Sequence, residues 1–353
     1  MELLADFLTS DFLGKTVWLW FAFLVVVGAL LAFDLGVLHK HDRELGVGES
    51  LALSAFYIAI ALVFGAWLWW SMGPTSGMEY FTGYALEKAL SIDNVFVISL
   101  IFSYFAIPAK YQYRALLWGI LAVLVLRGIM IGLGAALVQQ YEWVLYVFGA
   151  FLIATGIKML VMGENKQDVS KNPIVRFLSK RMRVSAESHG SYFFVRKPDP
   201  KTGKLARFAT PLFLALVVIN IADLIFAVDS VPAIFAITTD TYIVFTANIM
   251  AILGLRALYF ALAAMVHRFE YLKYALAIVL VFIGAKIFWN QIVGKLDPAI
   301  SLSVTLFLIA GGVMLSLWKT RAAATDETAS HGLTAPLPGS IGKRISARPT
   351  GDD

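Results

Sequence analysis

The sequence predicts an all-α membrane protein, a polytopic bundle of about nine transmembrane helices with inverted-topology repeats. Three observations support this fold class. Of the 353 residues, 59% are hydrophobic and the mean hydropathy is +0.76. Charged residues make up only 15%, against about a quarter in soluble domains. The apolar runs are long, and backbone groups in lipid must be paired internally, so these runs should be helical.

The apolar runs divide the chain into segments in the following order. The predicted spans are 16–38, 50–71, 80–105, 114–138, 143–162, 209–236, 243–266, 272–292 and 300–318. The predicted units are an N-terminal segment with the first helix (1–48), a second helix (49–79), repeat 1 (80–162), a basic cytoplasmic loop (163–208), repeat 2 (209–292), a last helix (293–320) and a disordered cytoplasmic tail (321–353).

The charges in the loops predict the orientation. Lys and Arg are abundant in 163–208 and absent from the loops Met72–Glu79 and Gln139–Glu142. Cytoplasmic loops carry an excess of Lys and Arg, so the N-terminus should lie outside and the C-terminus inside. We interpret the basic loop as a solvated topogenic segment rather than a lipid-binding one. The net charge of +5 fits the same rule and does not suggest nucleic acid.

Two acidic segments resemble each other at identical spacing. EKALSIDNVF (87–96) aligns with DLIFAVDSVP (223–232), which places Glu87 on Asp223 and Asp93 on Asp229. Further matches follow in order: GILAVLVLRG (119–128) with NIMAILGLRA (248–257), which places Arg127 on Arg256, then YEW with FEY, and GIK (156–158) with GAK (284–286). Four landmarks in the same order indicate a repeat rather than coincidence.

The two repeats have opposite topology according to the loop charges, because residues 80–105 run inward and residues 209–236 run outward. Inverted repeats are typical of secondary transporters, whose site lies near the bilayer midplane where the repeats meet. Charges there are costly, about 2.5–3.5 kcal/mol on insertion scales. They could serve a structural purpose as mutual ion pairs, but intramembrane ionisable groups are functional by default. We therefore predict an ion site.

The candidate ligands are oxygens. The predicted metal-binding set is Glu87, Asp93, Asn94, Asp223, Asp229 and Asp34, and the predicted gating or charge-compensating set is Lys88, Arg127, Arg256 and Asn220. The chain has no cysteine, which excludes disulfides and thiolate ligands. Carboxylate and amide oxygens favour a hard divalent cation such as Mn²⁺, Mg²⁺ or Ca²⁺. Asp34 could equally be a gate carboxylate or reach the interface.

Helical geometry limits how these acids can act. On a regular helix Tyr84, Glu87, Ser91 and Asn94 share one stripe, and Asp93 lies about 120° away from Glu87. Both acids can face one point only if the helix is broken; otherwise Asp93 serves a neighbouring position. In the second repeat, Pro232 removes a backbone donor and favours such a break.

The segments ALEKALSIDNVFV and NIADLIFAVDSVPAIFAITTD resemble the TerC family of integral membrane proteins. The family is named for tellurite resistance, its bacterial Alx members are associated with alkaline pH and manganese export, and it is grouped with LysE-like exporters. The resemblance implies that Glu87, Asp93, Asn94, Asp223 and Asp229 form the ion site, with Asp34 less directly implied. It also implies a multi-pass protein of the bacterial inner membrane.

We therefore expect a secondary transporter, not an enzyme, that exports Mn²⁺ by proton antiport. The expected partners are the lipid bilayer, the divalent ion and protons, with no nucleic acid and no tightly bound cofactor. Two alternatives remain open. One is a membrane platform that delivers metal or binds partner proteins, and the other is an exporter of a cationic organic solute.

Overall fold

The computed structural model describes residues 2–38, 46–161, 184–185, 189–198, 205–262 and 271–332. The side chain of Asp93 and most of the basic loop lie outside these described residues. The described chain is helical throughout, apart from two small antiparallel hairpins. This confirms the all-α fold class.

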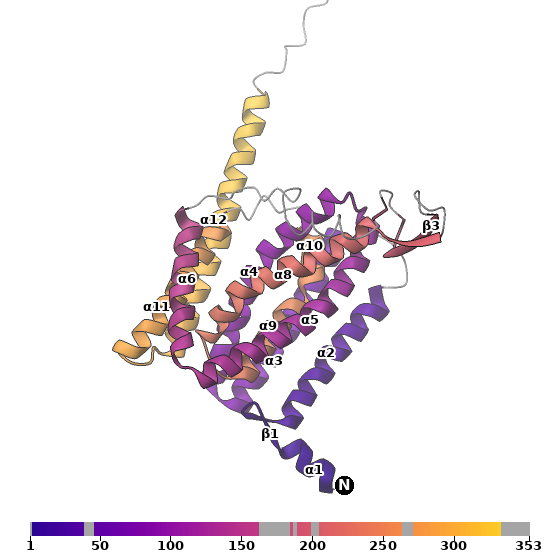
Figure 1. Cartoon of the computed structure of the whole chain (residues 1–353). Coiled ribbons are helices and arrows are strands. Elements are labelled where there is room, and N and C mark those ends of the chain that lie inside the picture. Colours follow the sequence, from indigo (N-terminus) through magenta and orange to yellow (C-terminus); the bar gives the residue numbers. More distant parts are fainter. Residues whose placement is uncertain are drawn as a thin grey trace, which may run out of the picture.

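The helices pack into a single bundle (Figure 1). Their bounds are α1 (Glu2–Thr9), α2 (Val17–Leu38), α3 (Val47–Met72), α4 (Pro74–Tyr104), α5 (Ala109–Gln140), α6 (Trp143–Val161), α8 (Pro211–Phe235), α9 (Thr241–Leu253), α10 (Leu255–Leu262), α11 (Leu272–Ile292) and α12 (Pro298–Gly332). The strands β1 (Asp11–Phe12) and β2 (Lys15–Thr16) form one hairpin, and β3 (Phe194–Pro198) and β4 (Leu205–Ala209) form the other.

Seven of the described helices are long and apolar enough to cross a membrane, and the bent pair α9–α10 raises that number to eight. Helix α4 is outside this set. Its 31 residues are ample for a bilayer, and it packs along α3, α8 and α9. α4 therefore lies among the spanning helices although it carries ionisable residues.

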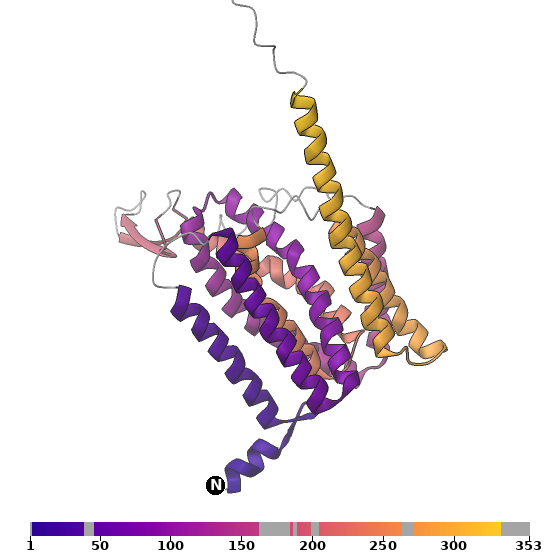
Figure 2. The same cartoon turned by 180° about the vertical axis from the view of Figure 1, so that it is seen from behind.

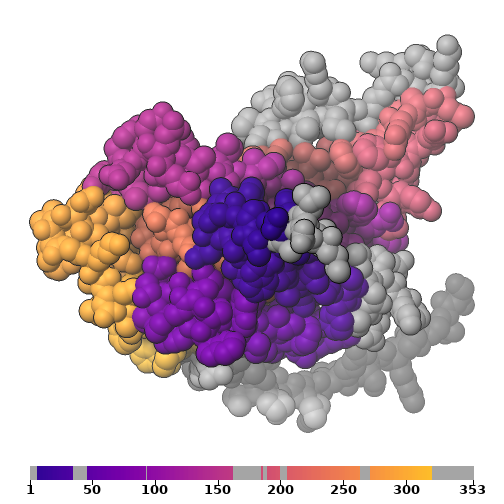
Figure 3. Space-filling view, turned by 90° about the horizontal axis from the view of Figure 1, so that it is seen from below, coloured from indigo at the N-terminus to yellow at the C-terminus, as the bar shows by residue number. Residues whose placement is uncertain are grey.

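The two ends of the bundle differ. Figures 1 and 2 place α1 on one side of the helices and the far end of α12 on the other, together with the β3–β4 hairpin. From the side of the N-terminus, the N-terminal segment lies over the middle of the molecule (Figure 3). Thus α1 and the hairpin that carries Arg196 and Arg207 are on opposite faces.

Local signals explain where the helices near the centre begin. Gly73 has a positive φ of 96° and is followed by Pro74 at the first position of α4, which suits glycine and proline respectively. Thr210 accepts a hydrogen bond from the Phe213 amide at the start of α8. The Asp240 side chain accepts from the amides of Tyr242 and Ile243 at the start of α9. Such side-chain caps satisfy otherwise unpaired donors.

Pro232 does not break its helix, and one helix extends further than the sequence indicated. Helix α8 continues through Pro232 to Phe235, because the lost donor falls close to the end of the helix and leaves few bonds to disturb. The break lies instead at Gly254, where α9 and α10 meet at 41°. Helix α12 also extends to Gly332, so the first part of the predicted disordered tail is helical. The remainder, 333–353, lies outside the described residues.

The inverted repeat is visible in the packing. Helices α4, α5 and α6 correspond in sequence to α8, α9–α10 and α11. Helix α4 packs on α9, α5 packs on α8, and α6 packs on α11. A two-fold axis between the repeats would exchange the first two contacts and map the third onto itself. This is the pattern expected for two halves of opposite topology.

Four small residues on α6 and α11 show the same symmetry at atomic level. A Cβ at Gly149 would meet the Gly284 carbonyl oxygen at 3.1 Å, and one at Gly156 would meet the Ala277 carbonyl oxygen at 2.6 Å. In the alignment of the two repeats, Gly156 corresponds to Gly284 and Gly149 corresponds to Ala277, both at an offset of 128 residues. The axis therefore exchanges one contact with the other. Small residues of this kind allow close helix approach in membranes.

Candidate functional site

The centre of the site is the guanidinium of Arg127 on α5. It forms an ion pair with Glu87 Oε2 of α4 at 3.0 Å and another with Asp223 Oδ1 of α8 at 3.3 Å. Asp223 is the central residue of α8. The two acids are equivalent positions of the two repeats, so the structure brings the first acid of each repeat to one arginine near mid-depth.

Two further polar side chains, Asn94 of α4 and Ser230 of α8, complete this cluster, which we call the Arg127 cluster (Glu87, Asn94, Arg127, Asp223 and Ser230). Arg127 Nη1 donates to Ser230 Oγ at 2.9 Å, and Asn94 Nδ2 donates to Asp223 Oδ1 at 3.5 Å. All five side chains are buried. In the sequence alignment Asn94 falls on Ser230, so this pair also contributes one residue from each repeat.

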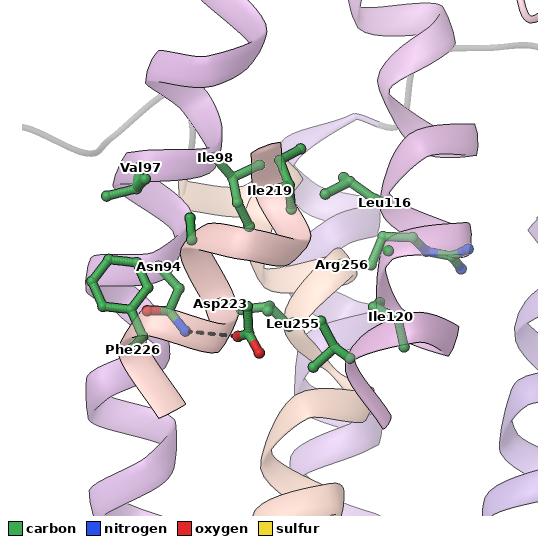
Figure 4. Close-up of a pocket in the computed structure, with 13 residues that line it drawn as sticks. Asn94, Val97, Ile98, Leu116, Ile120, Ile219, Asp223, Phe226, Leu255 and Arg256 are labelled. Atoms are coloured by element: carbon green, nitrogen blue, oxygen red, sulfur yellow. Dashed lines mark hydrogen bonds between the residues drawn. The ribbon is translucent and has the colours of Figure 1, made fainter. Parts of the chain in front are cut away.

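Arg256, the repeat partner of Arg127, does not join the cluster. Its guanidinium forms an ion pair with Asp34 on α2 and lies over the Tyr113 ring, 4.3 Å from the ring centroid. Figure 4 shows this guanidinium pointing away from Asp223. Asp34 is buried, and its carboxylate faces Arg256 inside the bundle. The centre is therefore asymmetric: one arginine holds both central acids, and the other holds an acid from outside the repeats.

A cavity of about 30 Å³ adjoins Asp223. Asn94, Asp223 and Arg256 supply its polar lining, and Gly119, Ile120 and other apolar residues of the same helices complete its wall (Figure 4). A volume of roughly 10–15 Å³ is enough for one water. The cavity could therefore hold a water or a dehydrated ion beside the carboxylate.

The remaining predicted residues occupy separate places. Lys88 Nζ donates to the Ala251 carbonyl at 3.1 Å, close to the α9–α10 break. The Asn220 side chain donates to the Leu216 carbonyl at 2.8 Å. Asp229 is half-buried, and the charge that acts on it is Lys158 of α6 rather than Arg127. The position of the Asp93 carboxylate lies outside the described side chains.

Helix α4 is continuous through Glu87 and Asp93. Of the two arrangements that the sequence allowed, a broken helix or acids that serve different positions, the structure has an unbroken helix. The same holds for α8, where Asp223 belongs to the Arg127 cluster and Asp229 does not. Among the described residues, no three His, Asp or Glu side chains lie together in a metal-ligand group.

The sequence interpretation missed Ser230 as an arginine partner and Asn248 altogether. Ser230 aligns with Asn94, a candidate ligand, so its position carried a signal. Asn248 is buried on α9 and aligns with Gly119. Because Gly119 has no side chain, the alignment gave no chemical reason to select Asn248. Tyr84 was also on the stripe, and its hydroxyl is buried.

Comparisons with known proteins agree with this fold. The model of the integral membrane protein TerC family matches residues 72–324. The chain belongs to the TerC family. An uncharacterised membrane protein of Myxococcus xanthus is 44% identical over 309 residues, covering 88% of this chain and 95% of that protein. One from Rickettsia bellii is 44% identical over 298 residues, covering 84% of this chain and 96% of its own length.

A further relative of this TerC protein carries a functional name. It is the Escherichia coli K12 protein Alx, described provisionally as a membrane-bound redox modulator, and it is 42% identical over 309 residues, covering 85% of this chain and 94% of Alx. No solved structure matches the chain. The family match spans every helix that contributes to the Arg127 cluster.

Proposed function

We propose that this TerC protein exports a divalent metal cation, Mn²⁺ above all, in exchange for protons, and that the Arg127 cluster is its central binding site. One observation carries the proposal: Glu87 and Asp223, one from each inverted half, converge on a single buried arginine beside a small cavity. Transporters with inverted repeats bind their substrate at such a midplane meeting point.

The chemistry of the cluster favours a hard cation. Its ligand atoms are carboxylate, amide and hydroxyl oxygens, which suit Mn²⁺, Mg²⁺ and Ca²⁺. Two carboxylates close together in a low-dielectric interior repel each other and need a positive charge between them. Without the metal, Arg127 supplies that charge. A divalent ion that enters beside Asp223 would compete with the guanidinium for the same oxygens.

Proton exchange follows from the same groups. Ionised carboxylates bind the metal, and protonated carboxylates bind it weakly because the proton occupies a ligand lone pair and removes the charge. Protons that arrive from outside would therefore release the metal there. Transport of this kind needs no nucleotide. The name of the Escherichia coli relative refers to redox, and because none of the 353 residues is a cysteine, thiol exchange within this chain is excluded.

The test is Mn²⁺ transport in vesicles that contain purified protein, with a Mn²⁺-quenched dye inside and a pH dye in a parallel set. Wild type should move Mn²⁺ and dissipate a pH gradient when Mn²⁺ is added. Glu87→Gln and Asp223→Asn should lower the Mn²⁺ rate at least about tenfold. Glu142→Gln, at an exposed position between α5 and α6, is the control and should transport normally. Normal rates in both central variants would refute the proposal.

The second acid of each repeat, Asp93 or Asp229, allows a test with a smaller expected effect. Asp229→Asn should slow transport without abolishing Mn²⁺ binding, because Asp229 lies in the field of Lys158 and outside the Arg127 cluster. Asp93→Asn tests the corresponding position of the first repeat. Wild-type transport rates in both variants would remove these two acids from the transport path.

A further inference from the structure

Three buried polar groups near the Arg127 cluster lack hydrogen-bond partners among the described residues. They are the Tyr84 hydroxyl, Glu87 Oε1 and both side-chain polar atoms of Asn248. Asn248 has no exposed surface, and Glu87 and Tyr84 are 1% and 6% exposed. Buried polar groups without a partner are destabilising and uncommon, so three in one region suggest a missing ligand.

The depth of Asn248 follows from its neighbours on α9. A Cβ at Gly83 of α4 would lie 3.4 Å from the Ala247 Cβ. Further along both helices, Lys88 Nζ donates to the Ala251 carbonyl. Along the helix axes, Asn248 lies between these two contacts. The stretch of α4 that carries Tyr84 and Glu87 lies between them too.

The direction of Asn248 follows from the other face of α9. A Cβ at Gly128 of α5 would lie 3.5 Å from the Phe245 ring, and Ile252 packs in one apolar cluster with Val123 of α5. Thus one face of α9 contacts α4 and another contacts α5. Because each residue is rotated by about 100° around the helix axis, the Asn248 side chain leaves α9 between these two faces. Its side chain is therefore directed into the space between α4 and α5, where Arg127 meets Glu87.

The repeat symmetry relates this region to the cavity beside Asp223. The alignment places Asp223 on Glu87, Gly119 on Asn248, and Arg256 on Arg127. Asp223, Gly119 and Arg256 all line the cavity. Their partners therefore surround the symmetry-related position near Glu87. The cavity beside Asp223 is lined by Gly119. At the symmetry-related position near Glu87, the corresponding residue is Asn248, a buried amide without a partner among the described residues.

We propose that Glu87, Asn248 and Tyr84 form a second cation subsite, related by symmetry to the cavity at Asp223 and separated from it by the Arg127 guanidinium. The inference rests on the proposed function and adds a further stage to it. Asn248 supplies a neutral amide oxygen and Tyr84 a phenolic oxygen, which a dehydrated divalent cation accepts as ligands beside one carboxylate.

Arg127 has a defined part in this arrangement. Its Nη1 donates to Glu87, and its Nε and Nη2 donate to Asp223. A cation at one subsite takes over one carboxylate while the guanidinium keeps its ion pair with the other. Both central acids therefore remain neutralised at every stage. An ion can pass between the subsites without leaving an unpaired buried charge, which would otherwise be strongly destabilising.

The test compares equilibrium binding of Mn²⁺ to the purified protein with its transport in vesicles. Asn248→Leu keeps the side-chain volume but removes the amide. It should lower the transport rate at least about tenfold and change the Mn²⁺ dissociation constant by no more than about threefold, because the Asp223 subsite remains. Tyr84→Phe, which removes one oxygen, should lower the rate in the same way by a smaller factor. Thr246→Val is the control, since its hydroxyl donates only within α9, to the Tyr242 and Ile243 carbonyls.

The outcomes separate this inference from the proposed function. Wild-type transport by Asn248→Leu, with Glu87→Gln and Asp223→Asn impaired, would overturn the second subsite and leave the central site standing. Wild-type transport by all three of these variants would overturn both. If Asn248→Leu does not fold, Tyr84→Phe decides alone, and its wild-type rate would overturn the subsite.

Discussion

Arg127 is the residue on which the centre of this structure depends most, and Arg127→Gln removes its charge. The guanidinium donates four hydrogen bonds, to Glu87, to Ser230 and twice to Asp223. Its side chain is 2% exposed. The substitution leaves two carboxylates buried without a cation, and breaking a buried ion pair on one side is destabilising by about 3–5 kcal/mol.

This loss can be expressed as a melting temperature. With an unfolding entropy of about 2.1 cal/mol/K per residue, the 353 residues give ~0.7 kcal/mol/K and a fall of roughly 4–7 °C. The assay is thermal unfolding in detergent, followed by tryptophan fluorescence. The triple variant Arg127→Gln, Glu87→Gln, Asp223→Asn should recover most of the loss, because no buried charge remains unpaired. A melting temperature unchanged by Arg127→Gln, or a triple variant as unstable as the single one, would show that the two buried acids do not depend on Arg127 for their charge balance.

Three further predictions concern single contacts and use the same unfolding assay. Asp34→Asn should destabilise by about 3–5 kcal/mol because it leaves Arg256 buried and unpaired; full stability would show that Arg256 has another partner. Gly156→Ala should lower the melting temperature, because the new Cβ would lie 2.6 Å from a backbone oxygen of α11. The matched variant Gly132→Ala meets nothing within 4 Å and should stabilise the protein by roughly 0.5–1 kcal/mol. If Gly132→Ala were the less stable of the two, the close contact between α6 and α11 would be contradicted. Lys15→Gln breaks the partly exposed pair with Asp240 and should change stability by less than about 1 kcal/mol; a larger loss would mean that this pair is not solvent-screened.

The spans and the repeat could be predicted because hydropathy and acid spacing are local properties of the chain. The convergence of Glu87 and Asp223 was predicted from the repeat, because transporters with inverted repeats have their site where the two halves meet. The partner of each arginine could not be predicted. Arg127 and Arg256 are equivalent in sequence, yet Arg256 pairs with Asp34 of α2, a helix outside the repeats. Only tertiary packing decides such a choice.

The helix break shows the same limit. Pro232 carried a strong local signal, but it lies so near the end of α8 that one missing donor does not bend the helix. Gly254 carried a weak one, and the 41° bend follows from surroundings that a sequence does not display. Tyr57 of α3 and the Lys88 ammonium both approach Gly254, and a Cβ there would lie 3.0 and 3.1 Å from their atoms.

The most direct test of the central site is anomalous scattering from crystals of the protein grown with Mn²⁺. We predict a manganese peak among α4, α5 and α8, with oxygens of Glu87 or Asp223 at roughly 2.0–2.6 Å and the Arg127 guanidinium displaced from that acid. A fully occupied peak elsewhere in the membrane region, with both ion pairs of Arg127 intact, would contradict it.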